Sequence, residues 1–211
     1  MAEETQNKLL ERSVHEFAEA VAAKKPTPGG GSVAGAVGML AVALGEMSLN
    51  FTRGKKKYAA HKPMHEHLAS RFQRARTMYE QLTYDDIEAY GLYSAARKVE
   101  DADEKAQAMS TALAAAIDVP REVAKLSLAV LEDLRRLADA CNRFLLSDLM
   151  AAAALASTVV RLADYNVQVN AQQVGDPAQA DELLASSGAD VRRAELMLAT
   201  IEDKCGRIIS G

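Results

Sequence analysis

The chain has 211 residues, of which 49% are hydrophobic and 26% are charged, a composition typical of folded proteins that argues against disorder. Its formal net charge of −4 gives no overall basic surface for nucleic acid, and two cysteines are too few for a disulfide framework. Much of the apolar share is alanine, which favours helices, so we predict one all-α domain over residues 1–211. The N-terminus is polar and acidic, and Gly, Glu and Arg interrupt the apolar stretches, so we expect a cytoplasmic protein without a membrane span.

The first predicted helix covers residues 5–23 and ends in a proline- and glycine-rich stretch. Its apolar face consists of Leu10, Val14, Phe17 and Val21. The stretch that follows is Pro26-Thr27-Pro28-Gly29-Gly30-Gly31-Ser32, and Ser32 is predicted to cap the next helix. Backbone N–H groups of a glycine turn at a helix start can bind an anion or a carbonyl group. A tight turn between two helices is the alternative interpretation.

The second predicted helix, residues 33–53, has two apolar faces. One consists of Val33, Val37, Leu40, Leu44, Met47 and Phe51. The other is a row of glycines and apolar residues, namely Gly31, Gly35, Gly38, Val42, Gly45 and Leu49. Because glycine costs about 1 kcal/mol per helix position, such a row indicates close approach of another helix or of a ligand. We therefore expect a central helix that is buried on several sides.

Three adjacent cations, Lys55, Lys56 and Lys57, follow the glycine that ends this helix. On an otherwise acidic chain they could attract a polyanionic substrate, or they could form a solvated surface loop. His61 and His65 then have the spacing of a helical metal pair, but Pro63 interrupts the turn between them. We therefore assign no metal site.

Asp86 is the candidate acid–base group of the chain. The third predicted helix, residues 63–99, is long, and its apolar residues recur at steps of three or four on one continuous face. Asp86 lies in the middle of that face, whereas Asp85 points elsewhere. Burial of a carboxylate raises its pKa, which suits general acid–base catalysis near neutral pH. A structural ion pair with Arg97 or with a lysine is the alternative.

The second half of the chain is predicted to form further helices. A short helix over residues 103–117 is expected to break at Asp118-Val119-Pro120, with Pro120 in the first turn of a new helix. Ser147 is predicted to cap a helix over residues 148–172, and the last helix runs from 177 to about 208 with an interruption at 186–188. Asn166 and Asn170 share one helical face and could bind the edge of a heterocycle.

In their order along the chain, these motifs resemble the C-terminal domain of formiminotransferase-cyclodeaminase, a domain that also occurs alone as a bacterial methenyltetrahydrofolate cyclohydrolase. The resemblance rests on the Pro-Thr-Pro-Gly-Gly-Gly-Ser stretch and on Gly54-Lys55-Lys56-Lys57-Tyr58, and it covers about residues 13–170. It implies an antiparallel up-and-down helical bundle that forms a homodimer. It also implies a folate site in a tunnel near the dimer interface.

The resemblance also implies roles for particular residues. It assigns the catalytic acid to Asp86. It assigns substrate binding to Gly29, Gly30, Gly31, Ser32, Lys55, Lys56, Lys57, Asp148, Asn166 and Asn170. The chain departs from the family pattern at Tyr84, Ile87 and Arg121, which concerns the details of the substrate more than the fold.

The activity that the resemblance implies is hydrolysis of 5,10-methenyltetrahydrofolate to 10-formyltetrahydrofolate. The first alternative is a cyclodeaminase that releases ammonia from formiminotetrahydrofolate. The second is a catalytically silent helical dimer that binds folate or a protein. Neither reaction requires a metal or a redox cofactor, so we expect the tetrahydrofolate derivative to be the only small molecule bound.

Overall fold

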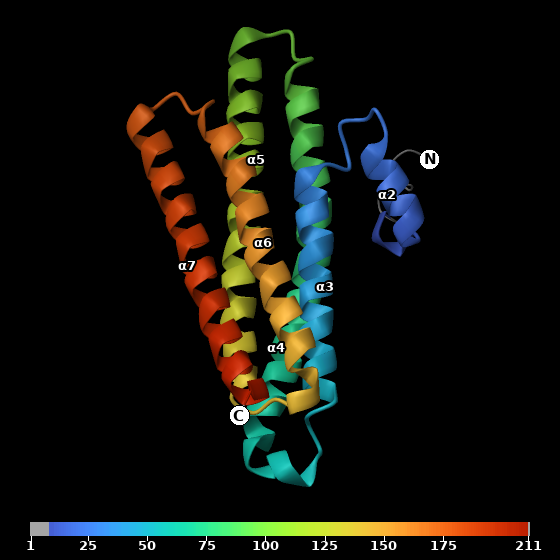
Figure 1. Cartoon of the computed structure of the whole chain (residues 1–211). Coiled ribbons are helices and arrows are strands. Elements are labelled where there is room, and N and C mark those ends of the chain that lie inside the picture. The colour runs from blue at the N-terminus through green and yellow to red at the C-terminus, as the bar shows by residue number, and fades with distance from the viewer. Residues whose placement is uncertain (1–8, 211) are drawn as a thin grey trace.

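The computed structural model describes residues 9–210, and within that range the chain is helical and has no strand. Four long helices form an antiparallel up-and-down bundle in which each packs mainly against two others (Figure 1). They are α3 (Gly30–Asn50), α4 (Lys62–Ala96), α5 (Ala102–Ala138) and α6 (Leu146–Ala171). A fifth long helix, α7 (Pro177–Ser210), packs against α5 and α6. The predicted all-α, up-and-down architecture is confirmed.

The N-terminal helix is shorter than predicted and stands to one side of the bundle (Figure 1), and the N–H of Leu10 before it donates to the hydroxyl of Tyr84 in α4. A 3-10 turn, η1 (Leu9–Glu11), precedes α2 (Val14–Ala22). Ser13 begins α2 because its hydroxyl accepts the N–H of Glu16 at 3.2 Å while the Glu16 carboxylate accepts the N–H of Ser13 at 2.9 Å. No residue of α2 is buried, and residues 5–8 of the predicted helix lie outside the described range.

The glycine row of α3 packs directly against α4. A Cβ atom placed on Gly31, Gly35 or Gly38 would collide with the side chain of Asp86, Thr83 or Tyr79, respectively. The prediction of a close helix approach is therefore confirmed. The opposite face of α3 is only partly covered by this chain: Leu40 is 59% and Phe51 is 57% exposed, whereas Val37 and Leu44 pack partly buried against the core. The expectation that α3 is buried on several sides is confirmed, because α3 packs against both α4 and α6 within the single chain.

Helix α5 runs without interruption through Pro120, so the predicted break at residues 118–120 is wrong. A proline cannot donate to the carbonyl four residues earlier, which here belongs to Ala116. The side-chain amide of Asn170 donates to that carbonyl instead, at 2.7 Å. The tertiary partner replaces the missing backbone hydrogen bond, and α5 continues.

Three smaller predictions also fail for local reasons. Ser32 and Ser147 lie inside the first turns of α3 and α6, whose N-caps are Gly29 and Leu145. Helix α7 continues through residues 186–188, where the hydroxyl of buried Ser187 donates to Asp164 of α6 at 2.7 Å.

By length and composition alone, two segments could cross a membrane: Gly30–Asn50 and Arg143–Ala171, each with a mean hydropathy of 1.6. In this structure about half of each segment is buried inside the bundle. Core helices of a water-exposed bundle satisfy the same criterion as membrane spans, so this finding is weak evidence for a membrane.

Candidate active site

Asp86 of α4 faces the first turn of α3, where it contacts Ser32. The Ser32 hydroxyl donates to Oδ2 of Asp86 at 2.9 Å, and the Ser32 side chain is fully buried. Burial raises the pKa of Asp86, and hydrogen bonds from the hydroxyl and the backbone N–H of Ser32 lower it only in part. Within residues 9–210 no basic side chain counteracts this rise, which removes the ion-pair alternative. The expected direction of the pKa shift is thus confirmed.

A cavity of about 340 Å³ opens beside Asp86, at the end of the bundle where α3 begins and α6 ends. The glycine turn forms one wall, and apolar residues of α5 around Pro120 form another. The rings of Tyr90 and Tyr93, 6.5 Å apart, also line it. Aromatic and apolar walls around one desolvated carboxyl group suit a flat, partly polar ligand.

Asn166 and Asn170 both line this cavity, as the shared helical face predicted. Their amino groups are already bonded within the protein. Asn166 Nδ2 donates to the carbonyl of Leu162 at 3.0 Å, and Asn170 Nδ2 donates to the carbonyl of Ala116 at 2.7 Å. Each side chain thus has one of its two N–H groups engaged, while no hydrogen bond within the described chain occupies its amide oxygen, which is available as an acceptor for a ligand.

The structure brings Asp86, Asn166, Asn170, Gly29, Gly30 and Gly31 together around one cavity. Ser32 joins them through its hydrogen bond to Asp86.

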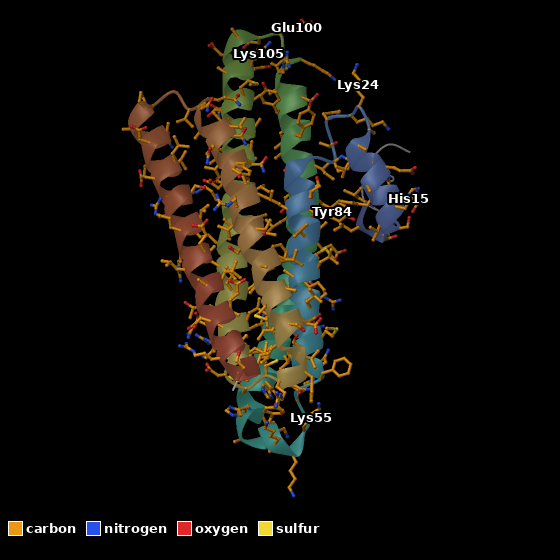
Figure 2. The ribbon with its side chains drawn as sticks, viewed as in Figure 1. His15, Lys24, Lys55, Tyr84, Glu100 and Lys105 are labelled. Atoms are coloured by element: carbon orange, nitrogen blue, oxygen red, sulfur yellow. The ribbon has the colours of Figure 1, made fainter. Side chains whose placement is uncertain are left out.

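The lysines and Asp148 lie elsewhere in the chain. Figure 2 shows Lys55 at the far end of the bundle, well away from Tyr84, which is two residues before Asp86. The length of α3, about 30 Å at 1.5 Å per residue, separates the glycine turn from the lysine loop. Asp148 is in the first turn of α6, roughly 27 Å along that helix from Asn166. Within one chain these groups cannot act on the same small ring as Asp86.

Sequence reasoning assigned no site role to Pro120, the Ala116 carbonyl or the two tyrosines. The signal for Pro120 was present, because a proline in the middle of a helix leaves one carbonyl without a donor. Identifying the replacement donor required the packing of α5 on α6. Tyr90 and Tyr93 were visible as members of the long face of α4, but nothing in the pattern separated them from core residues.

A larger groove of about 740 Å³ lies between α4 and α5, on another side of α4. There Arg71 Nε donates to both carboxylate oxygens of buried Asp133, at 2.8 and 2.7 Å. Lys125 is paired with Asp190 in the same way, at 2.6 Å. Arg71 and Lys125 are thus paired with carboxylates of the same chain and are less available to bind an anionic ligand. We therefore take the smaller cavity as the candidate site. Within residues 9–210, no three His, Cys, Asp or Glu side chains are arranged to bind a metal ion.

An antiparallel helical bundle with one desolvated carboxyl group at a lined cavity defines a candidate acid–base enzyme. The formiminotransferase-cyclodeaminase family model matches residues 13–188, and the chain belongs to this family.

Named relatives cover most of the chain. A methenyltetrahydrofolate cyclohydrolase of Methylorubrum extorquens is 31% identical over 84% of this chain and 91% of its own length. The mouse formimidoyltransferase-cyclodeaminase is 32% identical over 80% of this chain, which spans only 32% of that longer protein. The crystal structure of a formiminotetrahydrofolate cyclodeaminase from Thermotoga maritima superposes with a TM-score of 0.85. It is 32% identical and covers 95% of this chain and 99% of its own.

Proposed function

We propose that this protein hydrolyses 5,10-methenyltetrahydrofolate to 10-formyltetrahydrofolate and that Asp86 is its acid–base group. The observation that supports the proposal best is a carboxyl group with a raised pKa beside a cavity with apolar and acceptor walls. The proposed substrate is the one named for the relative from Methylorubrum extorquens, which matches this chain along nearly its whole length.

In the proposed reaction, water attacks the cationic carbon that bridges N5 and N10. Ionised Asp86 accepts a proton from the attacking water, which gives a neutral adduct with a tetrahedral carbon. The bond from this carbon to N5 then breaks, Asp86 returns its proton to N5, and the hydroxyl proton leaves to solvent as the formyl group forms on N10. A carboxyl group that both takes and returns a proton works best with a pKa near the working pH, and such transfer contributes about 10²- to 10⁴-fold.

The remaining cavity residues would orient the substrate. The N–H groups at the start of α3 and the amide oxygens of Asn166 and Asn170 would bind the polar edge of a ring that rests against Tyr90 and Tyr93. The reaction as written consumes only water, so we propose that no metal or redox cofactor takes part. We further propose that the protein works in the cytoplasm, away from membranes and nucleic acid.

We also propose that two copies associate through the outer face of α3, formed by Val33, Val37, Leu40, Leu44, Met47 and Phe51. This face is apolar and incompletely covered, with Leu40 and Phe51 both more than half exposed. A symmetric contact about a two-fold axis perpendicular to α3 is antiparallel. Centred between Leu40 and Leu44, it places Val33 opposite Phe51 of the partner subunit.

This arrangement gives the lysine loop, residues 55–57, a role that it cannot have within one chain. The loop follows Phe51, so in the antiparallel dimer it reaches the glycine turn of the other copy. The lysines would then attract the anionic glutamate tail of a folate bound beside Asp86 of that copy. Asp148, in the first turn of α6, lies at the same end as the loop and would reach the site by the same route.

Cyclodeamination is the second candidate, because the protein from Thermotoga maritima with the same fold is named for it. In that reaction N10 attacks the formimino carbon and ammonia leaves from the tetrahedral adduct. Asp86 would move the protons in both reactions. Release of ammonia from formiminotetrahydrofolate separates the two.

The decisive test follows the absorbance of methenyltetrahydrofolate with the wild-type protein, Asp86→Asn and Asp85→Asn. Asp85 is the matched control because it adjoins Asp86 but lines the other groove, where Gln81 donates to it at 2.8 Å. We expect accelerated decay with wild type and Asp85→Asn, and a loss of about 10²-fold or more with Asp86→Asn. Full turnover by Asp86→Asn would refute the assignment. Folate binding without either reaction would instead support a silent binder.

A further inference from the structure

The middle of α5 contains a carbonyl group that its own helix cannot satisfy. Pro120 occupies the position whose N–H would bond to the carbonyl of Ala116, and proline has no N–H. The carbonyl is instead bonded to Nδ2 of Asn170, which comes from α6 and lies 2.7 Å away. Both groups line the cavity beside Asp86.

This bond fixes which way the Asn170 amide points. A carbonyl oxygen only accepts hydrogen bonds, so the amino group of Asn170 must face Ala116 and the amide oxygen must face away from it. Within the described chain, Oδ1 of Asn170 accepts no hydrogen bond. Because Asn170 lines the cavity, we take this oxygen, held in one orientation by the bond to Ala116, as the acceptor that Asn170 offers there.

We propose that Pro120 is a positioning residue: by leaving the Ala116 carbonyl without a donor, it holds Asn170 so that the site presents an acceptor to an N–H group of the ligand. The inference relies on the proposed function for the ligand, a reduced pterin, whose ring has several N–H and amino donors along its edge. A ligand with only acceptors at this point is disfavoured because two facing acceptors leave both unpaired.

Pro120→Ala tests the positioning role. Alanine restores the N–H, the backbone bond to Ala116 re-forms, and the Asn170 amide becomes free to rotate. We expect KM for methenyltetrahydrofolate to rise about threefold to tenfold, the range for one neutral hydrogen bond, with kcat within about twofold of wild type. The melting temperature should stay constant or rise, because alanine is the better helix residue. Loss of binding without loss of stability is an outcome that a purely structural proline does not produce.

Pro177→Ala is the matched control, because Pro177 is the first residue of α7, where the backbone N–H has no helical hydrogen-bond acceptor. It should leave KM unchanged. Asn170→Ala should raise KM as Pro120→Ala does, and the double variant should show little further rise, since both changes remove the same fixed acceptor. Additive effects of the two changes would overturn the proposal.

A measurement without ligand keeps the proposal testable if Pro120→Ala folds poorly or the proposed function fails. In the NMR spectrum of the wild-type protein, the side-chain NH₂ of Asn170 should exchange slowly with solvent, whereas that of exposed Asn50 should exchange fast. Fast exchange at Asn170 would overturn the fixed orientation. A protected amide in a protein that neither binds nor converts tetrahydrofolates would instead refute the proposed function and leave the fixed orientation intact.

Discussion

Asp85 and Asp86 are neighbours in α4 that face different cavities. Asp86 contacts the buried hydroxyl of Ser32 beside the small cavity, and Asp85 lines the α4–α5 groove beside Gln81. Adjacent residues of a helix point about 100° apart, so one helix presents its two carboxylates to different surroundings. Burial against α3 raises the pKa of Asp86.

The first prediction concerns the pH dependence of stability. Because the pKa of Asp86 is raised on folding, its contribution to stability is full below the unfolded-state pKa and is lost as pH rises through the folded-state pKa. Asp86→Asn should therefore raise the melting temperature at pH 7 by about 2 °C or more, and the gain should vanish near pH 3. Thermal unfolding monitored by circular dichroism across this pH range measures it. A gain that is equal at both pH values would contradict the assignment.

The second prediction concerns Ser32. Its hydrogen bonds favour the ionised form of Asp86, so Ser32→Ala should raise the pKa of that carboxyl group further. The acidic limb of the kcat profile should move to higher pH, with a loss of about tenfold on that limb. Steady-state rates between pH 5 and pH 9 test this, with Ser147→Ala, an exposed serine in the first turn of α6, as the control. An unshifted limb would mean that Ser32 does not tune the catalytic group.

The third prediction concerns the glycine row of α3. Gly38→Ala places a methyl group against the ring of buried Tyr79 and should lower the free energy of unfolding by about 1–3 kcal/mol. Gly91→Ala in α4 is the control, since nothing lies within 4 Å of its added Cβ. It should raise that free energy by about 0.5–1 kcal/mol. Urea unfolding of both variants measures the two free energies. If both substitutions destabilised the protein, the loss at Gly38 could not be assigned to the contact with Tyr79.

The fourth prediction concerns the proposed dimer. Leu40→Glu places a charge in the middle of the outer face of α3 and should convert the dimer to monomers, as measured by sedimentation velocity. Leu196→Glu is the control because Leu196 is an equally large, 71% exposed leucine on α7. Dissociation by the control alone would place the interface on α7.

The fifth prediction concerns the lysine loop. A chain with Asp86→Asn and a chain with Lys55, Lys56 and Lys57 all changed to Ala should each be impaired alone. When the two chains are co-expressed and pair at random, about half of the dimers are mixed. In each mixed dimer one of the two sites combines an intact Asp86 with the intact loop of the other chain, so about a quarter of all sites should be active. If the lysines act within their own chain, co-expression restores no activity.

The periodicity of the sequence predicted helices α3, α4 and α6, and it placed Asp86 on the face of α4 that packs on the bundle, because a face repeated along the whole of α4 leaves little choice of orientation. It also located the glycine row, since only close packing explains small residues at that spacing. The break predicted at Pro120 failed because the rule is local while the replacement donor, Asn170, is 50 residues away in sequence. The caps predicted at Ser32 and Ser147 failed because nearby residues, Gly29 and Leu145, begin those helices.

The lysine loop shows a different limit. A sequence resemblance identifies candidate functional residues, but it does not give the distances between them in the folded chain. The 21 residues of α3 place the loop and the glycine turn at opposite ends of one rod. The resemblance implied a homodimer, and the geometry of the bundle with its partly exposed apolar face on α3 supports the proposal that a second copy brings the two together.

The contact between Gly31 and Asp86 has a consequence for how this site can diverge. Any side chain at position 31 would occupy the space of the carboxyl group at position 86. A descendant of this chain that acquires even a methyl group there must turn the carboxyl group away or move α3 outward. A change at position 31 therefore requires a change in the conformation or the residue at position 86. Glycine at position 31 allows the Asp86 carboxyl group to stay beside the first turn of α3.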